Sequence, residues 1–382
     1  MRWLALAGGS IAALALVAGL CLALPTDRPA FRPDELASIG SLGPWPPPAL
    51  RDASNRVSGR AEAAALGEVL FHSTRLSTVG GLRCASCHEP WRQFTDGRAH
   101  ALGADAGARN TPSLLNVRLQ HWFGWDGAND SLWSQSIRPM LDVREMRSDA
   151  AHVAQALRDD DTLKRLYALA FGRAPPADDE AALVDAGKAL AAYQETLASE
   201  RTPFDAWRDA LVRGDSAAAQ RYPLAAQRGL RLFVGRGRCV ACHAGPNFSD
   251  GEFHRSSIVS TLHDGTRDSG RALGLEKLLA SPYARSGRFD DEVNAARRPA
   301  SQAPEAGAFR TPGLREVSAT APYMHDGSIA NLCDALRQHA ALEGRLMTAL
   351  TLAERRDVVA FLRTLSAQER AVLVDEDAMA CR

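Results

Sequence analysis

The sequence predicts an all-α fold in two domains that are related by an internal repeat, with long loops between the helices. Apolar residues recur at helical spacing, no segment shows sustained period-two alternation, and one block of residues occurs twice. The 382 residues are enough for two domains, each with its own core. One apolar stripe, with steps of three and four residues, runs through Leu183, Ala186, Leu190, Tyr193 and Leu197.

The first residues have the character of an export signal. Arg2 supplies a positive charge, and residues 3–24 follow without a charged side chain. That run is long for a signal peptide and just long enough to cross a bilayer. We therefore expect residues 1–24 to be either a cleaved signal or a retained membrane anchor. Both place the folded part, in a bacterium, in the periplasm, either soluble after cleavage or held by the anchor.

Low-complexity composition marks the segments between the predicted helices. Residues 25–60 are rich in proline and polar side chains, so we predict an extended linker or a strap over the surface, with ordered structure from about Ala61. Residues 94–129 and 244–322 are rich in Gly, Asp, Asn and Pro. Loops of such length are uncommon unless they wrap something, and a large cofactor would supply the missing core.

The internal repeat sets the domain organisation. In each copy an apolar helix end precedes Cys-x-x-Cys-His, and Phe-Thr/Ser-Asp-Gly follows. The copies span residues 67–97 and 229–251. We infer that one ancestral domain has been used twice. A break in the pattern near residues 213–222 divides the chain into an N-terminal domain, 61–215, and a C-terminal domain, 216–382.

The two Cys-x-x-Cys-His motifs carry the chemistry. Two thiols three residues apart can reach both vinyl groups of one porphyrin, and the adjacent histidine can bind its iron. A zinc site would need further paired ligands, and a redox dithiol normally lies beside a βαβ pattern, which is absent. We therefore predict two covalently bound haem c groups, attached through Cys84, Cys87 and His88 and through Cys239, Cys242 and His243.

Charge and the remaining cysteines give weaker information. The 45 basic and 45 acidic residues cancel, so the basic excess that a nucleic-acid partner needs is missing. Beyond the haem motifs and the leader, Cys333 and Cys381 remain. An oxidising compartment permits them to pair, but two free thiols fit the sequence equally well.

With these motifs in place, the chain resembles the bacterial dihaem cytochrome c peroxidase superfamily, which includes the MauG protein-oxidising enzymes. The resemblance implies two α-helical cytochrome c domains, a peroxidatic haem in the first, an electron-transfer haem in the second, and one calcium ion between them. The matching motifs, in family order, are Arg109-Asn110-Thr111-Pro112, Trp125-Asp126-Gly127, Glu145-Met146, Phe309-Arg310-Thr311-Pro312 and Ala321-Pro322-Tyr323-Met324-His325-Asp326-Gly327.

The same resemblance implies roles for single residues. Glu145 matches a distal acid that moves a proton between the peroxide oxygens, a role that an ionised carboxylate in a partly apolar pocket can perform. Trp125 matches an indole that carries electrons between the haems. The other matching positions are Gln135 and Pro139, which shape the distal pocket, and Asn110 with the carbonyls of Thr320 and Pro322, which bind calcium.

The first departure from the peroxidase pattern is a missing distal histidine. The position falls on Ala104 when counted from His88 and on Leu102 when counted from Asn110. Neither side chain can bind iron, so we expect an open first haem. His100 lies in the same loop, offset from both registers, and stays as an alternative ligand.

The second departure concerns the sixth ligand of the second haem, which is a methionine in family peroxidases and a tyrosine in MauG-like members. Here the register lands on His339. An imidazole donates more electron density than a thioether, so ligation by both His243 and His339 should lower the potential of this haem.

Together these features predict an enzyme, a peroxide-dependent dihaem c-type oxidoreductase similar to cytochrome c peroxidase. It would reduce hydrogen peroxide at the open N-terminal haem with electrons passed through Trp125 from the C-terminal haem. The electron donor would be a small periplasmic cytochrome c or cupredoxin. The first alternative is a MauG-like oxidase that modifies side chains of a partner protein through a high-valent state shared by two haems.

Two further alternatives stay open. One is a non-enzymatic dihaem electron-transfer cytochrome, and the other is an oxygenase that acts on an organic substrate. The sequence also leaves open a membrane tether and a homodimer.

Overall fold

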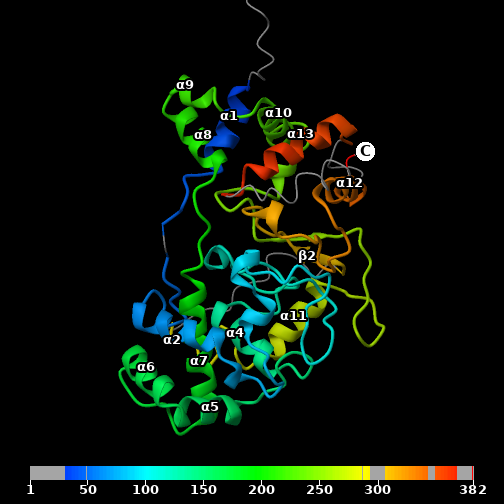
Figure 1. Ribbon diagram of the computed structural model, residues 1–382. Helices are drawn as coiled ribbons and strands as arrows, with labels where there is room; N and C mark the ends of the chain where they lie inside the picture. The colour runs from blue at the N-terminus through cyan, green and yellow to red at the C-terminus, as the bar shows by residue number, and fades with distance from the viewer. Residues whose placement is uncertain are drawn as a thin grey trace, which may run out of the picture.

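The computed structural model describes residues 31–48, 50–285, 287–292, 306–342, 349–367 and 381. It is mostly helical, which confirms the all-α prediction. The helices gather in two lobes, with loops and a short sheet between them (Figure 1). The predicted leader, residues 1–24, lies outside the described residues, and none of the helices within them is long and apolar enough to span a bilayer.

The first lobe is built around a buried helix. Helix α7 (Asp179–Gln194) is enclosed along nearly its whole length. Gly67 of α2 packs so closely on it that a Cβ would come 2.0 Å from the carbonyl oxygen of Ala189. The helices of this lobe are α2 (Ala61–His72), α4 (Leu132–Leu141), α5 (Ala150–Asp159), α6 (Asp161–Phe171) and α7.

The second lobe repeats this contact. Gly229 of α10 lies against α13, where a Cβ would come 1.9 Å from the carbonyl oxygen of Asp357. The repeated glycine thus permits the same helix crossing in both copies. The helices of this lobe are α1 (Pro33–Ser41), α8 (Pro203–Val212), α9 (Ser216–Ala219), α10 (Leu224–Val234), α12 (Leu332–Leu342) and α13 (Leu352–Arg363).

Two of these helices come from unexpected parts of the sequence. Helix α1 lies within the segment that we expected to be an extended linker, and Ile39 at its end is fully buried. Helix α8 precedes the expected domain boundary but contributes Phe204 and Trp207 to the second core. Aromatic packing places α8 in the second lobe although it precedes the expected boundary, because Trp207 stacks on Tyr222 with ring centres 4.7 Å apart.

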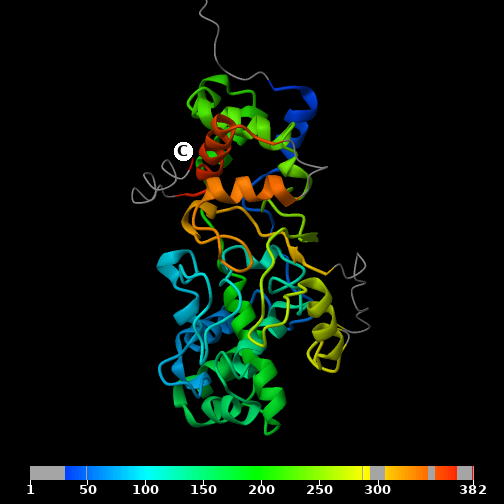
Figure 2. The same ribbon diagram turned by 90° about the vertical axis from the view of Figure 1, so that its right-hand side faces the viewer.

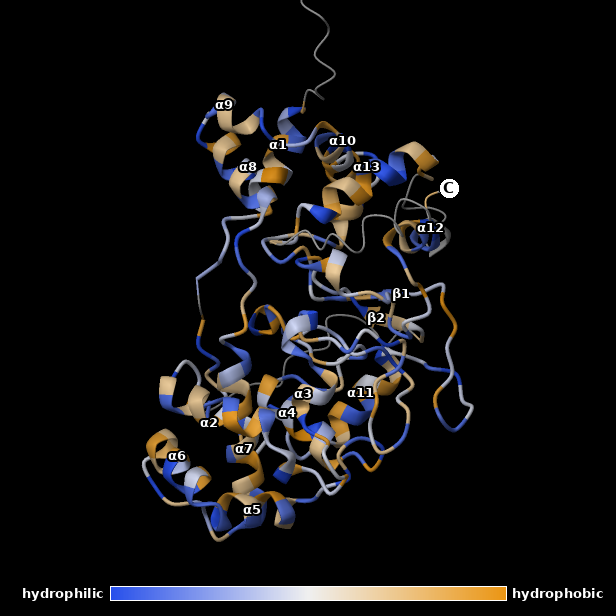
Figure 3. Cartoon of the chain, viewed as in Figure 1, coloured by the Kyte–Doolittle hydropathy of each residue, from blue (hydrophilic) through white to orange (hydrophobic). Residues whose placement is uncertain are grey.

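The region between the lobes consists mainly of loops (Figure 2). Strand β1 (Phe253–Arg255) pairs antiparallel with β2 (Ala308–Arg310), and Phe253 lies opposite Arg310. Helix α11 (Arg271–Ala280) flanks the first lobe, and α3 (Cys84–Cys87) is formed by the first haem motif. Apolar residues concentrate inside the helical lobes, whereas the connecting loops are mixed (Figure 3). The 3-10 helices are Thr74–Leu76, Pro90–Arg92, Val117–Leu119, Cys239–Ala241 and Val317–Ala319.

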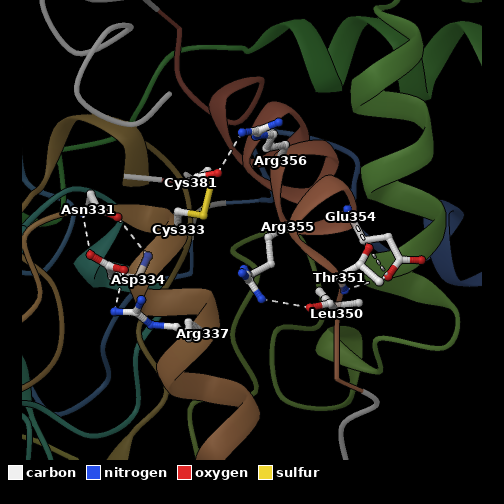
Figure 4. Close-up of a disulfide and its surroundings, with 10 residues drawn as sticks. All are labelled: Asn331, Cys333, Asp334, Arg337, Leu350, Thr351, Glu354, Arg355, Arg356 and Cys381. Atoms are coloured by element: carbon white, nitrogen blue, oxygen red, sulfur yellow. Dashed lines mark hydrogen bonds and ion pairs between the residues drawn. A yellow bond between two sulfur atoms is a disulfide. The ribbon is translucent and has the colours of Figure 1, made fainter. Parts of the chain in front are cut away.

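The two cysteines whose pairing the sequence left open form a disulfide. Cys333 of α12 forms a disulfide with Cys381, with Cα atoms 5.4 Å apart (Figure 4). The carbonyl oxygen of Cys381 accepts a hydrogen bond of 2.9 Å from Arg356 of α13. Cys381 is therefore joined to α12 by the disulfide and to α13 by the hydrogen bond.

The lobes meet through reciprocal backbone contacts. The amide of Asn110 donates to the carbonyl of His325, and the amide of Arg310 donates to the carbonyl of Trp125, each over 2.9 Å. Asn110 and Arg310 hold the same place in their respective Thr-Pro motifs, as Trp125 and His325 do in their Asp-Gly motifs. The contact thus resembles the self-complementary interface of a two-fold dimer.

Candidate functional site

Both haem motifs present their histidine in the same way. Nδ1 of His88 lies 3.0 Å from the carbonyl oxygen of Phe94, and Nδ1 of His243 lies 3.0 Å from that of Phe248. Each ring is thereby held in one orientation, and its Nε2 is left for a metal. The two phenylalanines have φ of 58° and 55°, which is unusual for a bulky residue. This strained turn is what the repeated Phe-Thr/Ser-Asp-Gly motif encodes.

His339 of α12 lies opposite His243. The two imidazole ring centres are 6.4 Å apart. Two imidazoles that bind one metal ion through bonds of about 2.0 Å would have ring centres about 6.2 Å apart. Nδ1 of His339 lies 2.9 Å from the carbonyl oxygen of Ala335, so this ring is also held in one orientation. Burial, followed by the neighbouring His339, lowers the pKa of His243 to about 4, which keeps its ring neutral as a ligand must be.

A cavity of about 470 Å³ surrounds this pair. Its lining includes Cys239, Cys242, His243 and His339, and its volume is in the usual range for a cofactor site. Arg310 also lines it, and burial lowers the pKa of this guanidinium to about 10. The Arg310 side chain donates only to carbonyl oxygens among the residues described, so a buried positive charge faces the cavity. These features fit a haem c, whose propionates would complement Arg310.

A second charged pair borders the same cavity and was not assigned a role from sequence. Nε2 of His254 lies 2.7 Å from a carboxylate oxygen of Asp250. Hydrogen bonding to Asp250, with a smaller contribution from Cys242, raises the pKa of His254 to about 10. The pair brings Asp250 of the repeated Asp-Gly motif together with strand β1. That proximity depends on the fold of the loop and has no periodic signal.

The candidate distal residues of the first site gather at the end of α4. The amide of Met146 donates to the carbonyl of Pro139 over 3.1 Å, which brings the adjacent Glu145 to this helix end. Arg138 donates to the Glu145 carboxylate over 2.6 Å. The negative charge of the Glu145 carboxylate is the largest cause of a raised pKa at Arg138.

Glu145 also faces the first haem motif. Burial lowers the pKa of His88, and the negative charges of Glu145 and Asp96 partly oppose that shift. Burial raises the pKa of the Cys84 thiol to about 12, and Glu145 adds to the effect. The carboxylate is therefore close enough to act electrostatically on the groups that would hold the first haem.

Pro139 stands where the second half has His339. The loops before α4 and α12 contain matching bridges, Phe123 with Asn129 and Tyr323 with Ile329, and the helices then begin at Leu132 and Leu332. Residue numbers in these two loop-and-helix segments differ by the same amount throughout, so Pro139 of α4 and His339 of α12 hold equivalent positions. The constant spacing between the two halves is a sequence signal for this equivalence, and it extends beyond the haem motifs.

Residues of two loops contact the other side chains that were predicted to shape the distal pocket. The Gln135 side-chain oxygen accepts a hydrogen bond of 2.8 Å from Asn129, which orients its amide. The loop that lacks the distal histidine lies over Glu145, because the amide of Ala104 donates to the Glu145 carbonyl over 2.9 Å. His100, the alternative iron ligand, is exposed in this structure. Leu102 is also exposed, and its carbonyl lies 2.8 Å from Sγ of Cys87.

Trp125 lies between the two halves. Its indole Nε1 donates to the carbonyl of Asn110 over 2.8 Å, and its own carbonyl accepts from Arg310. The ring lines the cavity beside His243. It therefore contacts the Thr-Pro motifs of both domains at once.

The predicted calcium ligands line the same cavity. Asn110 donates its side-chain amide to the carbonyl of Arg98 over 2.8 Å, which leaves its side-chain oxygen for a cation. Thr320 and Pro322 lie at the cavity wall on the other domain. Oxygen donors of this kind suit Ca²⁺, and the assignment stays a prediction.

Comparison with known proteins gives consistent matches. Residues 61–214 match the family model described as di-haem cytochrome c peroxidase. The chain is 34% identical over 326 residues to methylamine utilization protein MauG of Methylorubrum extorquens, covering 82% of this chain and 81% of that protein. It is 32% identical over 340 residues to cytochrome-c peroxidase IdrP2 of Denitromonas iodatirespirans, covering 81% and 83%.

Two solved structures share the fold. The diheme peroxidase BthA from Burkholderia thailandensis superposes with a TM-score of 0.63 at 25% identity, covering 81% of this chain and 87% of that one. A MauG-like protein associated with microbial copper homeostasis gives 0.62 at 26% identity, covering 87% and 97%.

Proposed function

Because the chain belongs to the di-haem cytochrome c peroxidase family, we propose that it reduces hydrogen peroxide at the N-terminal haem site with electrons that pass through Trp125 from the C-terminal site. Family membership makes it an oxidoreductase with two c-type haems that acts on peroxide. The finer proposal is carried by one asymmetry. His339 stands opposite His243, whereas the equivalent position of the first half is Pro139, which has no ligand atom to offer.

The residues at the end of α4 would handle the proton. A haem with an open iron position supplies the site at which peroxide binds and its O–O bond is cleaved. Glu145 accepts a proton from the near oxygen of peroxide and delivers it to the departing oxygen, as a positioned general acid–base does. Arg138 donates a hydrogen bond of 2.6 Å to that carboxylate and fixes its direction. Gln135, whose side-chain oxygen accepts a hydrogen bond from Asn129, would contribute its amide to the distal pocket.

Trp125 connects this site to the second one. Its N–H donates to Asn110, and its carbonyl accepts from Arg310, so the indole is held by the backbone of both domains. A ring held in this way changes its position little when its charge changes. Asn110, Thr320 and Pro322 would bind Ca²⁺ at the same junction and stabilise it. Export to the periplasm and a small cytochrome c or cupredoxin as the electron donor complete the proposal.

Resting-state spectroscopy of the purified holoprotein tests the asymmetry. We expect one high-spin and one low-spin ferric signal, cyanide binding at one haem only, and peroxide consumption when a reduced cytochrome c is present. Two low-spin haems that take up neither cyanide nor peroxide would contradict the proposal and leave a simple electron-transfer cytochrome.

A second candidate is oxidation of side chains on a partner protein. It is favoured by the imidazole opposite His243, since a strongly donating pair lowers the potential of the second haem and makes it a poor acceptor from ordinary cytochromes. Relatives named MauG support the same direction. Stoichiometric peroxide added to the fully oxidised protein separates the two candidates. A two-electron-oxidised protein that persists for minutes favours this candidate, and rapid turnover with reduced cytochrome c favours the peroxidase.

A further inference from the structure

Cations lie over several of the buried tryptophans. Distances from the charged group to the indole centre are 3.5 Å for Arg315 over Trp45, 4.2 Å for Arg271 over Trp122, and 5.3 Å for Lys188 over Trp133. Among the residues that the structure describes, no cation lies over the ring of Trp125. The tryptophan between the domains thus differs electrostatically from its neighbours.

Arg271 differs from the other two cations because it forms no ion pair within the described part of the chain. Arg315 forms an ion pair of 2.9 Å with Asp205, and Lys188 one of 2.6 Å with Asp291. Arg271 instead donates to the backbone carbonyls of Gly127 and Asp126, over 2.7 and 3.3 Å. It is only 4% exposed and has no ion-pair partner within the described part of the chain. The carboxylates of Asp126, Glu252 and Asp130 attract this guanidinium without forming an ion pair with it, so its positive charge still acts on the rings that it touches.

The guanidinium of Arg271 lies between two rings, Trp122 and Phe253, with 4.2 Å to each ring centre. Removal of an electron from an indole leaves a positive charge on the ring. A cation that attracts the neutral ring repels the oxidised one, and the repulsion is strong where water is excluded. Trp122 is 4% exposed, so little solvent screens this effect.

Trp122 and Trp125 lie three residues apart on the same loop, so they would compete to donate electrons to the same oxidant. Trp125 has the opposite environment, because its N–H donates to the carbonyl oxygen of Asn110 over 2.8 Å. That bond strengthens when the indole becomes positive, which stabilises the oxidised ring.

We propose that Arg271 directs oxidation to Trp125 by making Trp122 a poor electron donor. The inference rests on the proposed function, which supplies hydrogen peroxide as the oxidant. Peroxide takes up two electrons and two protons and leaves as two water molecules. Without an external donor, an indole loses two electrons and two protons and gains the oxygen of one water, which gives a hydroxylated tryptophan.

Mass spectrometry of the dihaem holoprotein can locate that oxygen. Trypsin releases residues 119–144 as one peptide, because the bond between Arg138 and Pro139 resists it. The peptide contains Trp122, Trp125 and Trp133, so its fragment ions divide the added oxygen among the three indoles. A few equivalents of peroxide are added without donor. We expect the added oxygen at Trp125 in the wild type.

In the Arg271→Gln variant we expect the share of oxygen at Trp122 to rise about tenfold, since a buried cation–π contact has that order of effect. Arg271→Lys keeps a cation and should keep the share low. Arg267→Gln is the matched control, because Arg267 lies on the same segment, is exposed, and is not stacked on a tryptophan. An unchanged share at Trp122 in Arg271→Gln overturns the inference.

A second variant covers the case in which Arg271→Gln does not fold. In Trp125→Phe, Arg271 is intact, so oxidation should not move to Trp122. If it does move there, the inference is wrong. If the wild type neither consumes peroxide nor oxidises Trp125, the proposed function itself fails, and the inference fails with it.

Discussion

The imidazole rings of His243 and His339 face each other with their centres 6.4 Å apart, although His243 belongs to the haem motif and His339 lies far along the chain on α12. Each ring is oriented by a backbone carbonyl at its Nδ1, that of Phe248 for His243 and that of Ala335 for His339. The pair is therefore prepared to bind one metal ion from both sides.

Replacement of His339 should open the second haem. We expect His339→Ala to make this haem high-spin and able to bind cyanide, and His339→Met to keep it six-coordinate with a potential higher by on the order of 100 mV or more. Redox titration and cyanide binding measure both effects. The exposed His100→Ala variant is the control and should leave the second haem unchanged.

The reverse change should close the first haem. Pro139→His places an imidazole at the position equivalent to His339, and it removes a proline from inside α4, which favours the helix. We expect a low-spin first haem and a loss of peroxide turnover. Pro139→Ala should stay high-spin and active. A Pro139→His enzyme with wild-type turnover would show that the two positions are not equivalent.

Glu145→Gln should retain both haems but lose proton transfer. We expect kcat for peroxide to fall by about 10²- to 10⁴-fold, the usual contribution of a general acid–base. Asp142→Asn is a suitable control, because Asp142 is the more distant carboxylate partner of Arg138, at 3.4 Å. Stopped-flow peroxide kinetics would reveal equal rates if Glu145 only stabilised the loop.

Trp125→Phe should slow electron transfer between the domains without preventing peroxide from binding. Phenylalanine keeps an aromatic ring but loses the N–H that donates to Asn110 and is much harder to oxidise. We expect reduction of the first haem by way of the second to become slower, while cyanide affinity stays the same. Trp207→Phe, in the core of the second lobe, serves as the control.

Stability should depend on pH through Asp268, which joins the domains. Burial alone would raise the pKa of this carboxyl, but the hydrogen bond and charge of Arg109 outweigh it and hold the pKa below its ordinary value. A lowered pKa stabilises the fold above the unfolded-state value of about 3.9, and the contribution is lost as the pH falls through the folded-state pKa.

We therefore expect Asp268→Asn to cost about 3 kcal/mol at pH 7, as the loss of one partner of a buried ion pair does, and less at pH 3. Thermal unfolding at both pH values measures the difference. Asp105→Asn, at an exposed carboxylate, should have little effect at either. A cost that is the same at pH 7 and pH 3 would contradict the ion-pair explanation.

The sequence predicted the helical class because periodic apolar spacing is local information, and its haem motifs brought cysteines and histidine together within five residues. It could not place α1 or α8, because their apolar residues pack on partners far along the chain, such as Trp207 on Tyr222. The ion pair between Arg138 and Glu145 depends on how the chain turns after Pro139, which has no periodic pattern. The cation over Trp122 comes from α11, far along the chain, and had no signal at all.

The reciprocal amide bonds between the domains have one more consequence. The bonds from Asn110 to His325 and from Arg310 to Trp125 form an interface in which each domain contributes the same donor and acceptor positions. Because the two halves share this backbone arrangement, they can differ in chemistry through side-chain differences alone. Pro139 and His339 are one such pair of equivalent positions. Exchanging the side chains at equivalent positions of the two domains should therefore reverse their roles, so that the second domain reduces peroxide and the first transfers electrons.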